Sequence, residues 1–242
     1  MPSKPIVTFA EYLKLPRAPE TWILEGLLPV GGSMMLSGPA KLGKSYAALQ
    51  LAMTVSGQGD PFWFGIPRRQ TGTVVYVQLD TPRSLWADRG EKLLAQGYPI
   101  ETVCVADRGT LETWPFDILN PDHYQLLHAA LKVYDPVLVI MDTMRESSSA
   151  EENSSTELPA AVNKLIAVSQ PATLVLIHHT RKPGESTEID IVHDSRGTSA
   201  VPAKMDALCQ MTKKGLHYVG RSIEESFCPA KRDQDSGLWF TD

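Results

Sequence analysis

Residues 38–45 read Gly38-Pro39-Ala40-Lys41-Leu42-Gly43-Lys44-Ser45 and match the phosphate-binding loop G-x-x-x-x-G-K-[ST] at every fixed position. Such a loop gathers backbone N–H groups at the N-terminus of a helix, where the helix dipole favours negative charge. Lys44 is expected to reach the β and γ phosphates of a nucleoside triphosphate, and the Ser45 hydroxyl to ligate Mg²⁺. The pattern therefore predicts ATP and Mg²⁺ as ligands, with residues 38–45 and the adjoining Tyr46 as the nucleotide-binding residues.

The residues on either side of this loop fit the strand and helix that it requires. Residues 32–37 form a short, mostly apolar run typical of a buried strand. After the loop, apolar residues recur at the spacing of one helix face: Ala47, Ala48, Leu51, Ala52 and Val55. Gly57 is expected to end this helix, because glycine readily adopts the left-handed conformation found there.

Composition and length indicate one globular α/β domain. The chain has 242 residues, of which 43% are hydrophobic and 21% charged, with a net charge of −5. We expect residues 31–242 to form one nucleotide-binding domain and the Pro-rich residues 1–30 to pack on its core. We expect no membrane association and a cytoplasmic location, because apolar runs are short and the N-terminus lacks a signal-peptide pattern. The three cysteines are widely spaced and are expected to be reduced thiols: Cys104, Cys209 and Cys228.

Strands and helices alternate after residue 70. Apolar runs at 73–79 and 137–141 are typical of strands buried on both faces of a parallel sheet, and further strands are predicted at 103–105 and 173–177. Helices are predicted from Thr81 as N-cap to Gly97, from Asn120-Pro121 to Tyr134, and from about residue 158 to 169. The intervening residues 145–157 are polar without an apolar period, which predicts a mobile loop, and residues 182–194 are predicted as a second polar loop.

The C-terminal part of the chain changes to a period of two. Residues 208–212 and 216–220 flank Lys213-Lys214-Gly215 as a hairpin, and a further strand pair is predicted around the turn at residues 235–237. The predicted fold is therefore α/β: a mostly parallel sheet flanked by helices, with antiparallel C-terminal strands.

Three predicted strands end in ionisable residues. Ligands of doubly wound sheets bind at the carboxyl ends of the strands, so these residues are expected to face the phosphate-binding loop. Asp142 closes the run Val-Leu-Val-Ile-Met-Asp and is expected to hold Mg²⁺ together with Ser45. Asp80 is expected to orient or deprotonate the attacking water, the alternative being a cap for the helix that follows. Of the neighbouring His178 and His179, which point to opposite sides of a strand, His179 is the expected contact of the γ-phosphate.

Basic residues could complete the site of a neighbouring subunit. Phosphoryl transfer gains from a cation that stabilises the transition state, often supplied in trans. The candidates are Arg181, Lys182, Arg196 and Arg221, the alternative for each being a solvated surface charge. Arg196 is favoured because it lies in Asp-Ser-Arg-Gly-Thr-Ser-Ala, a tight glycine-containing segment.

From Thr21 to Phe240 the sequence resembles the RepA-like branch of the RecA-fold, AAA-type P-loop ATPases, which are relatives of hexameric replicative helicases. The resemblance is carried by residues 38–45, by Ile-His-His-Thr-Arg-Lys at 177–182 and by Arg-Gly-Thr-Ser-Ala at 196–200. It implies that Lys44 and Ser45 are the Walker A pair, Asp142 the Walker B aspartate and His179 the γ-phosphate sensor. Arg196 or a nearby basic residue would serve the neighbour's site.

The resemblance implies a homo-oligomer, a hexamer above all, with ATP sites between subunits and single-stranded DNA on its inner loops. The function expected is an ATP-driven motor in DNA replication or recombination, of the helicase type, in a bacterial, phage or plasmid context. DNA binding rests on the resemblance, because the 145–157 loop is acidic and the loops lack interleaved aromatic residues.

One departure keeps a second function open. The family usually places glutamate where this chain has Asp80, and a misplacement of about 1 Å can lower a rate on the order of 100-fold. Slow hydrolysis would suit an ATP-gated assembly or loading factor, or a recombination accessory. A metabolic kinase is disfavoured, because no acceptor-site or lid pattern is visible.

Overall fold

The structure is a computed structural model that describes residues 6–16, 20–112, 115–180, 190–191 and 200–241. Among these, the strands of the main sheet are β3 (Ser33–Ser37), β6 (Val74–Gln78), β7 (Cys104–Asp107), β8 (Leu138–Asp142), β9 (Thr173–Ile177), β10 (Ala207–Thr212), β11 (Gly215–Gly220), β12 (Ile223–Arg232) and β13 (Trp239–Thr241). The four longer helices are α2 (Lys44–Ser56), α3 (Arg83–Ala95), α4 (Pro121–Tyr134) and α5 (Glu157–Ser169).

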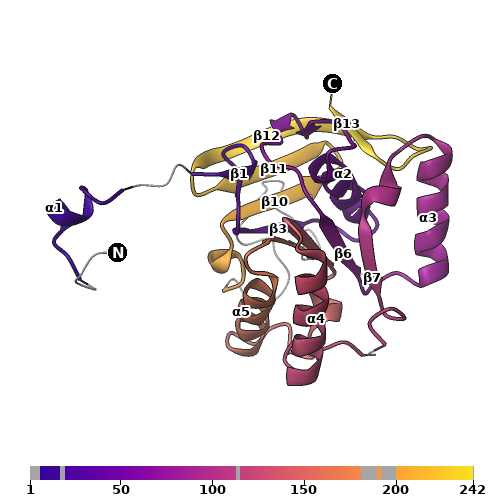
Figure 1. Ribbon diagram of the computed structural model, residues 1–242. Helices are drawn as coiled ribbons and strands as arrows, with labels where there is room; N and C mark the ends of the chain where they lie inside the picture. The colour runs from indigo at the N-terminus through magenta and orange to yellow at the C-terminus, as the bar shows by residue number, and fades with distance from the viewer. Residues whose placement is uncertain (1–5, 17–19, 113–114, 181–189, 192–199, 242) are drawn as a thin grey trace.

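These nine strands form one sheet in the order β13-β12-β11-β10-β3-β9-β8-β6-β7 (Figure 1). The strands from β10 to β7 run parallel to their neighbours, and β11, β12 and β13 extend the sheet with antiparallel pairs. The predicted α/β fold is therefore confirmed, including the hairpin between β10 and β11.

Helices cover both faces of this sheet. Along β8, Leu138 and Ile140 pack in the same core cluster as α2 and α3, whereas Val139 and Met141 pack with α4 and α5. Successive side chains of a strand point to opposite faces, so a strand between two helical layers must be apolar at every position. This explains the continuous apolar runs in the sequence.

Helix boundaries follow local hydrogen bonds. Asn120 caps α4 by accepting from Asp122 N at 2.9 Å, and Gly57 ends α2 with φ +86°. The predicted start of α3 was wrong: Pro82, not Thr81, is its N-cap residue. No side chain caps α3; the turn that leads into it is instead held by Gln78, whose Oε1 accepts from the backbone N–H groups of residues 80 and 81 at 2.7 and 2.8 Å.

The first part of the segment at 145–157 is packed, which corrects the prediction of a mobile loop there, whereas residues 151–157 are exposed or half-buried. It begins with the 3₁₀ turn η2 (Arg145–Ser147), and Ser147, Ser148 and Ala150 are buried. The Ser147 hydroxyl donates to Met144 O at 2.7 Å and the Ser149 hydroxyl to the Asp117 carboxylate at 2.6 Å. Serine is small enough to be buried when its hydroxyl finds a local acceptor, so polarity alone did not indicate exposure.

One part of the N-terminal region packs on the core of the domain, and another part does not. Residues of β1 (Trp22–Leu24) and β2 (Leu28–Pro29) pair with each other, and Ile23, Leu24 and Leu28 are fully buried. The short helix α1 (Phe9–Tyr12) instead stands apart from the rest of the molecule (Figure 1). The prediction that residues 1–30 pack on the core is therefore wrong for residues 6–13, because their large apolar side chains are exposed. The domain boundary at about residue 30 stays a prediction.

Smaller elements complete the described chain: the hairpin of β4 (Phe62–Trp63) and β5 (Ile66–Pro67), which the sequence analysis missed, and the 3₁₀ turns η1 (Ile100–Thr102) and η3 (Pro202–Lys204). Cys209 is buried, Cys104 and Cys228 are half-buried, and all three are free thiols. In the described ranges, no helix is both long and apolar enough to cross a membrane.

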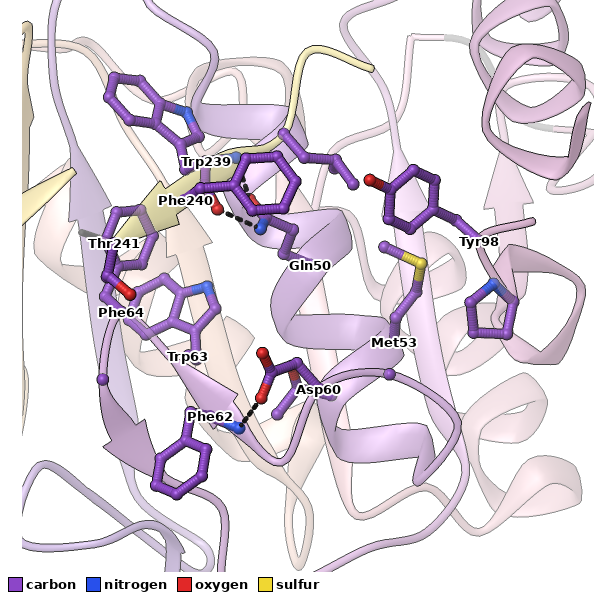
Figure 2. A pocket seen from close by; sticks show the side chains of 15 residues that line it. Gln50, Met53, Asp60, Phe62, Trp63, Phe64, Tyr98, Trp239, Phe240 and Thr241 are labelled. Atoms are coloured by element: carbon purple, nitrogen blue, oxygen red, sulfur yellow. Dashed lines mark hydrogen bonds between the residues drawn. The ribbon is translucent and has the colours of Figure 1, made fainter. Parts of the chain in front are cut away.

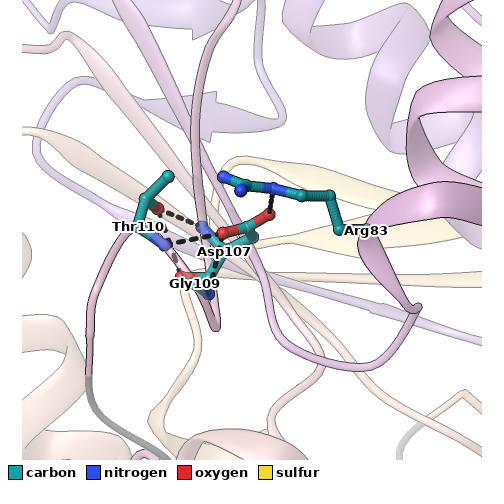
Figure 3. A network of polar contacts seen from close by, with 4 residues as sticks. All are labelled: Arg83, Asp107, Gly109 and Thr110. Carbon is teal, nitrogen blue, oxygen red and sulfur yellow. Dashed lines mark hydrogen bonds and ion pairs between the residues drawn. The ribbon is translucent and has the colours of Figure 1, made fainter.

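A network around Asp107 shapes the turn after the edge strand β7 (Figure 3). Asp107 Oδ1 accepts from the backbone of Gly109 and Thr110 at 2.9 and 2.8 Å, and Oδ2 accepts from Arg83 Nε at 2.7 Å. Burial alone would raise the pKa of Asp107, but the hydrogen bonds from Thr110, Arg83 and Gly109 outweigh it and lower this pKa. The ionised carboxylate therefore stabilises the fold above its ordinary pKa, and this contribution is lost as the pH falls through the lowered value.

Replacing Asp107 by alanine is expected to lower the free energy of unfolding by about 1–3 kcal/mol, because two backbone donors lose their acceptor. Asp107→Asn keeps the oxygen that caps Gly109 and Thr110 and should lose less. Arg83→Ala removes an ion pair whose arginine side chain is 66% exposed, so it should cost about 1 kcal/mol at most. Urea unfolding of the three variants at pH 7 measures this order, and an Arg83→Ala cost equal to that of Asp107→Ala would contradict it.

Candidate active site

The phosphate-binding loop joins the end of β3 to the start of α2, where the sequence analysis expected it. Gly43 has φ +109° and immediately precedes the first helical residue, Lys44. This backbone conformation favours glycine, and a Cβ atom on Gly43 would also lie 2.9 Å from Arg232 Nε, so that the arginine would have to move. The start of α2 therefore presents its backbone N–H groups without a side chain in front of them.

A cavity of about 290 Å³ lies directly over this loop. It is lined by Lys41, Gly43, Lys44, Ser45, Tyr46, Asp80, Thr81, Arg89, Asp142, Thr143, Ile177, His179 and Arg232. The strand register explains the convergence: Gln78 of β6 pairs with Asp142 of β8, and Leu36 of β3 pairs with Ile177 of β9. The structure thus brings Lys44, Ser45, Asp80, Asp142 and His179 to one cavity, although their sequence separation is large.

Lys44 is buried and points across the loop. Its Nζ donates to the carbonyl oxygens of Gly38 and Pro39, both at 2.9 Å, and lies 3.2 Å from Nδ1 of His179. Burial lowers the pKa of Lys44 to about 8, against the opposing attraction of Asp142 and Asp80. The ammonium group is thus held in low dielectric, where its interaction with a phosphate is strong.

Asp142 is fully buried at the end of β8. Its Oδ2 accepts from Tyr76 OH at 2.8 Å and from Gln78 Nε2 at 3.3 Å. Burial raises the pKa of Asp142, and hydrogen bonds from Ser45 and Tyr76 oppose that rise. A hydroxyl and a carboxylate oxygen side by side are the ligands that Mg²⁺ prefers, and Mg²⁺ commonly needs few protein ligands because phosphates supply the rest. The donor set of Ser45 and Asp142 therefore fits Mg²⁺ bound with a nucleotide.

Gln78 links the two carboxylate-bearing strand ends and was missed by sequence reasoning. Its amide nitrogen donates to Asp142, while its amide oxygen accepts from the backbone N–H groups of Asp80 and Thr81. Asp80 itself is exposed at the cavity. Because the N-cap residue of α3 is Pro82 and no side chain makes a cap hydrogen bond, the alternative role of Asp80 as a helix cap is not supported. The available signal was a polar residue at the end of an otherwise apolar strand.

The neighbouring His178 and His179 lie in different environments, as expected for adjacent residues at the end of a strand. His178 is 1% exposed, and its backbone N–H donates to Leu36 O at 3.0 Å. His179 is half-buried and lines the cavity beside Lys44. His179, rather than His178, is therefore the histidine placed to contact a bound group.

Two arginines at the cavity were not singled out from the sequence. The guanidinium groups of Arg89, on α3, and Arg232, on β12, lie 5.3 and 4.9 Å from the ring centroid of Tyr46. Arg232 Nε also donates to Gly237 O at 2.9 Å, which fixes its direction. No local pattern marks these arginines, because α3 and β12 meet the loop only through the tertiary fold.

Of the predicted trans-acting residues, the structure describes Arg221, which does not line this cavity. Arg221 forms an ion pair with Asp206 at 3.0 Å, and Asp206 accepts from Ser33 at the start of β3, the end away from the phosphate-binding loop. Arg181, Lys182 and Arg196 lie outside the described residues.

The lowered pKa of Lys44 leads to a prediction about nucleotide binding. Phosphate favours the charged amine, so binding of the nonhydrolysable analogue AMP-PNP should raise this pKa and take up a proton near pH 8 to 9. Affinity should accordingly fall as the pH rises above about 8. Calorimetry at pH 8.5 in buffers of different ionisation enthalpy measures the proton uptake. Lys132→Gln, on α4 outside the cavity, should keep the proton uptake, and proton release on binding would contradict the assignment.

Two comparisons bear on this geometry. A family model described as "AAA domain" matches residues 2–185 of the chain. A solved structure of a KaiC-like protein from the hyperthermophilic archaeon Pyrococcus horikoshii OT3 superimposes with a TM-score of 0.53. The two sequences are 14% identical, and the match covers 94% of this chain and 99% of that one. At this sequence identity, the likeness shows a shared fold alone.

Proposed function

The chain belongs to the AAA domain family and is a RecA-like P-loop ATPase, and we propose that it hydrolyses ATP in this cavity as an oligomer acting on single-stranded DNA. The single observation that carries the catalytic part is the convergence of Lys44, Ser45, Asp80, Asp142 and His179 on one cavity at the helix N-terminus. Each residue type supplies one requirement of phosphoryl transfer.

We assign a role to each of these side chains. Lys44 turns from the loop carbonyls to the β and γ phosphates, and the backbone N–H groups of residues 38–45 bind the phosphate oxygens. Ser45 and Asp142 would hold Mg²⁺, which supplies neutralisation of phosphate charge. Asp80 orients the attacking water, and His179 contacts the γ-phosphate. Arg89 and Arg232 add positive charge along the nucleotide beside Tyr46.

The oligomeric part of the proposal rests on the resemblance to ring-forming ATPases. Arg196 or a neighbouring basic residue would complete the site of an adjacent subunit and so couple hydrolysis to assembly. The DNA would contact the loops that follow β8 and β9, at the same edge of the sheet as the cavity.

Single-stranded DNA is therefore expected to raise the ATPase rate on the order of tenfold, a factor that corresponds to a typical coupling free energy between two sites. The measurement is steady-state phosphate release with and without an oligodeoxynucleotide, with light scattering on the same samples for oligomeric state. Duplex DNA of equal length is the control.

The shorter acid at Asp80 favours a second candidate, an ATP-gated assembly factor with slow hydrolysis. In that case ATP changes the oligomeric state and DNA leaves the rate unchanged. The same experiment distinguishes the two, because a DNA-insensitive rate with an ATP-dependent mass would rule out the motor.

A further inference from the structure

An aromatic pocket lies beside the second half of α2, and the proposed hydrolysis does not use it (Figure 2). Its volume is about 230 Å³, and an apolar cavity of about 150 Å³ is enough to hold benzene. Trp63, Phe64 and Trp239 are buried, whereas Phe62 and Phe240 are 51% and 48% exposed and leave the pocket open to solvent. Six aromatic residues line it: Phe62, Trp63, Phe64, Tyr98, Trp239 and Phe240. The pocket therefore has room for a planar group of one or two fused rings.

Hydrogen bonds hold the walls of this pocket in place. Gln50 Nε2 donates to Trp239 O at 2.6 Å, and Trp239 N donates to Gln50 Oε1 at 2.7 Å. Trp63 Nε1 donates to Ala47 O at 2.9 Å, and its ring packs edge to face on Phe64 with centroids 5.0 Å apart. A site whose walls are already fixed loses little conformational freedom on binding, which favours affinity. Apolar rings with a few placed polar groups are the usual lining of small-molecule sites.

A single carboxylate lies at this pocket. Asp60 is the only charged residue among the described residues that line it, and it is exposed. Its Oδ1 accepts from Phe62 N at 2.9 Å, which fixes the direction of the carboxylate (Figure 2). The faces of aromatic rings also carry negative potential and attract cations. Carboxylate and rings together therefore favour a positively charged ligand over a neutral or negatively charged one.

We propose that the aromatic pocket binds a small planar aromatic amine, with its ring between the aromatic side chains and its ammonium group beside Asp60. The Tyr98 hydroxyl points into the pocket and offers one further hydrogen-bonding group (Figure 2). The occupant is thus a free small molecule that combines an apolar ring system with one positive charge.

One wall of this pocket also borders the nucleotide cavity. Trp239 lines the aromatic pocket, and Arg232, its cross-strand partner on β12, lines the nucleotide cavity. Trp239 Nε1 donates to Gly43 O at 3.4 Å, one residue before Lys44. A ligand that fixes Trp239 therefore also restrains the phosphate-binding loop, so a nucleotide loses less conformational freedom when it binds. Amine and nucleotide should raise each other's affinity by the same factor, and this coupling rests on the nucleotide site of the proposed function.

Tryptamine is the probe, because it joins a two-ring aromatic group to an amine that is positively charged at pH 7. A ligand of this size should bind with a dissociation constant of about 1 mM or below. Indole-3-propionate has a similar size but a negative charge, and should bind about tenfold more weakly. Isothermal titration calorimetry on the wild-type chain measures both affinities. Absence of tryptamine binding, or equal affinity for the two ligands, would overturn the proposal.

Variants separate the contribution of the rings from that of the charge. Phe240→Ala should weaken tryptamine binding at least about fivefold, because an aromatic contact is lost. Asp60→Asn keeps an acceptor for Phe62 N, and should weaken tryptamine binding about fivefold while leaving the binding of neutral indole unchanged. Val133→Ala on α4, where the side chain is 81% exposed, is the control and should change neither affinity. If Asp60→Asn weakened indole as much as tryptamine, Asp60 would not be the partner of the ammonium group and the proposal would fail.

The coupling is measured by repeating the tryptamine titration with saturating AMP-PNP, which should strengthen binding at least about fivefold. Trp239→Phe keeps an aromatic wall without the Nε1 donor, so it should bind tryptamine but lose this effect. AMP-PNP is also titrated alone, which makes failure of the nucleotide site and failure of the aromatic pocket separate results. Tryptamine binding that AMP-PNP leaves unchanged would refute the link between the two cavities, whereas absence of AMP-PNP binding would refute the proposed function.

Discussion

Lys44→Ala is expected to reduce ATP hydrolysis to the background of the assay and to weaken ATP binding by at least about 100-fold. Removal of one preorganised charge or donor from a dry site typically costs a factor of 10²–10³. Lys44 is such a group, because it is 5% exposed and its ammonium is already held at the mouth of the loop by Gly38 and Pro39. Fluorescent nucleotide titration and phosphate release measure the two effects.

The variant should remain folded, which separates binding from stability. The pKa of Lys44 falls to about 8 because burial disfavours its charge, so the charged group costs stability at neutral pH. Removing it should leave the unfolding temperature unchanged or higher. Lys132→Gln, an exposed lysine on α4 outside the cavity, is the control and should retain turnover. Wild-type turnover in Lys44→Ala would refute the site assignment.

Asp80→Ala is expected to lower kcat by a factor of about 10²–10³ while ATP affinity stays near the wild-type value, because a water-orienting base acts mainly on the chemical step. Asp80→Glu should preserve or raise the rate, since the longer side chain matches the residue usual in the resembling family. Asp80→Asn keeps the shape without the charge and should behave like alanine. Single-turnover hydrolysis under saturating ATP isolates this step.

The structure sharpens how this series is interpreted. The N–H groups ahead of α3 are satisfied by Gln78, so an Asp80 variant should not unfold the helix start. Circular dichroism and the unfolding temperature check that point. If Asp80→Glu lost as much activity as Asp80→Ala with normal ATP binding, Asp80 would not be the base, although Lys44 and Asp142 would keep their assignments.

Much of the fold was predictable because its signals are local. The glycine pattern at 38–45, the continuous apolar runs of the parallel strands and the period-two C-terminal hairpin each depend on residues close in sequence. The first residues of helices were predicted less accurately. Thr81 was expected as a cap, but α3 begins one residue later, with Pro82 as its N-cap residue and no side-chain cap.

The missed features depend on contacts between distant segments. In the polar segment after β8, the Ser149 hydroxyl donates a hydrogen bond to Asp117, which lies 32 residues earlier. Arg232 lines the cavity together with residues of the distant phosphate-binding loop. Helix α1 stands apart from the body of the molecule. Short periodic patterns in the sequence carry no information on contacts between such distant segments.

The sequence by itself determined that a triphosphate loop lies between a buried strand and a helix, because glycine spacing and apolar periodicity are local properties of the chain. It also marked Asp80, Asp142 and His179 as strand-end residues. The tertiary structure alone decided that they share one cavity, that Gln78 ties Asp80 to Asp142, and that burial lowers the pKa of Lys44 to about 8. Strand order and desolvation produce these properties, and both arise when segments far apart in sequence pack together.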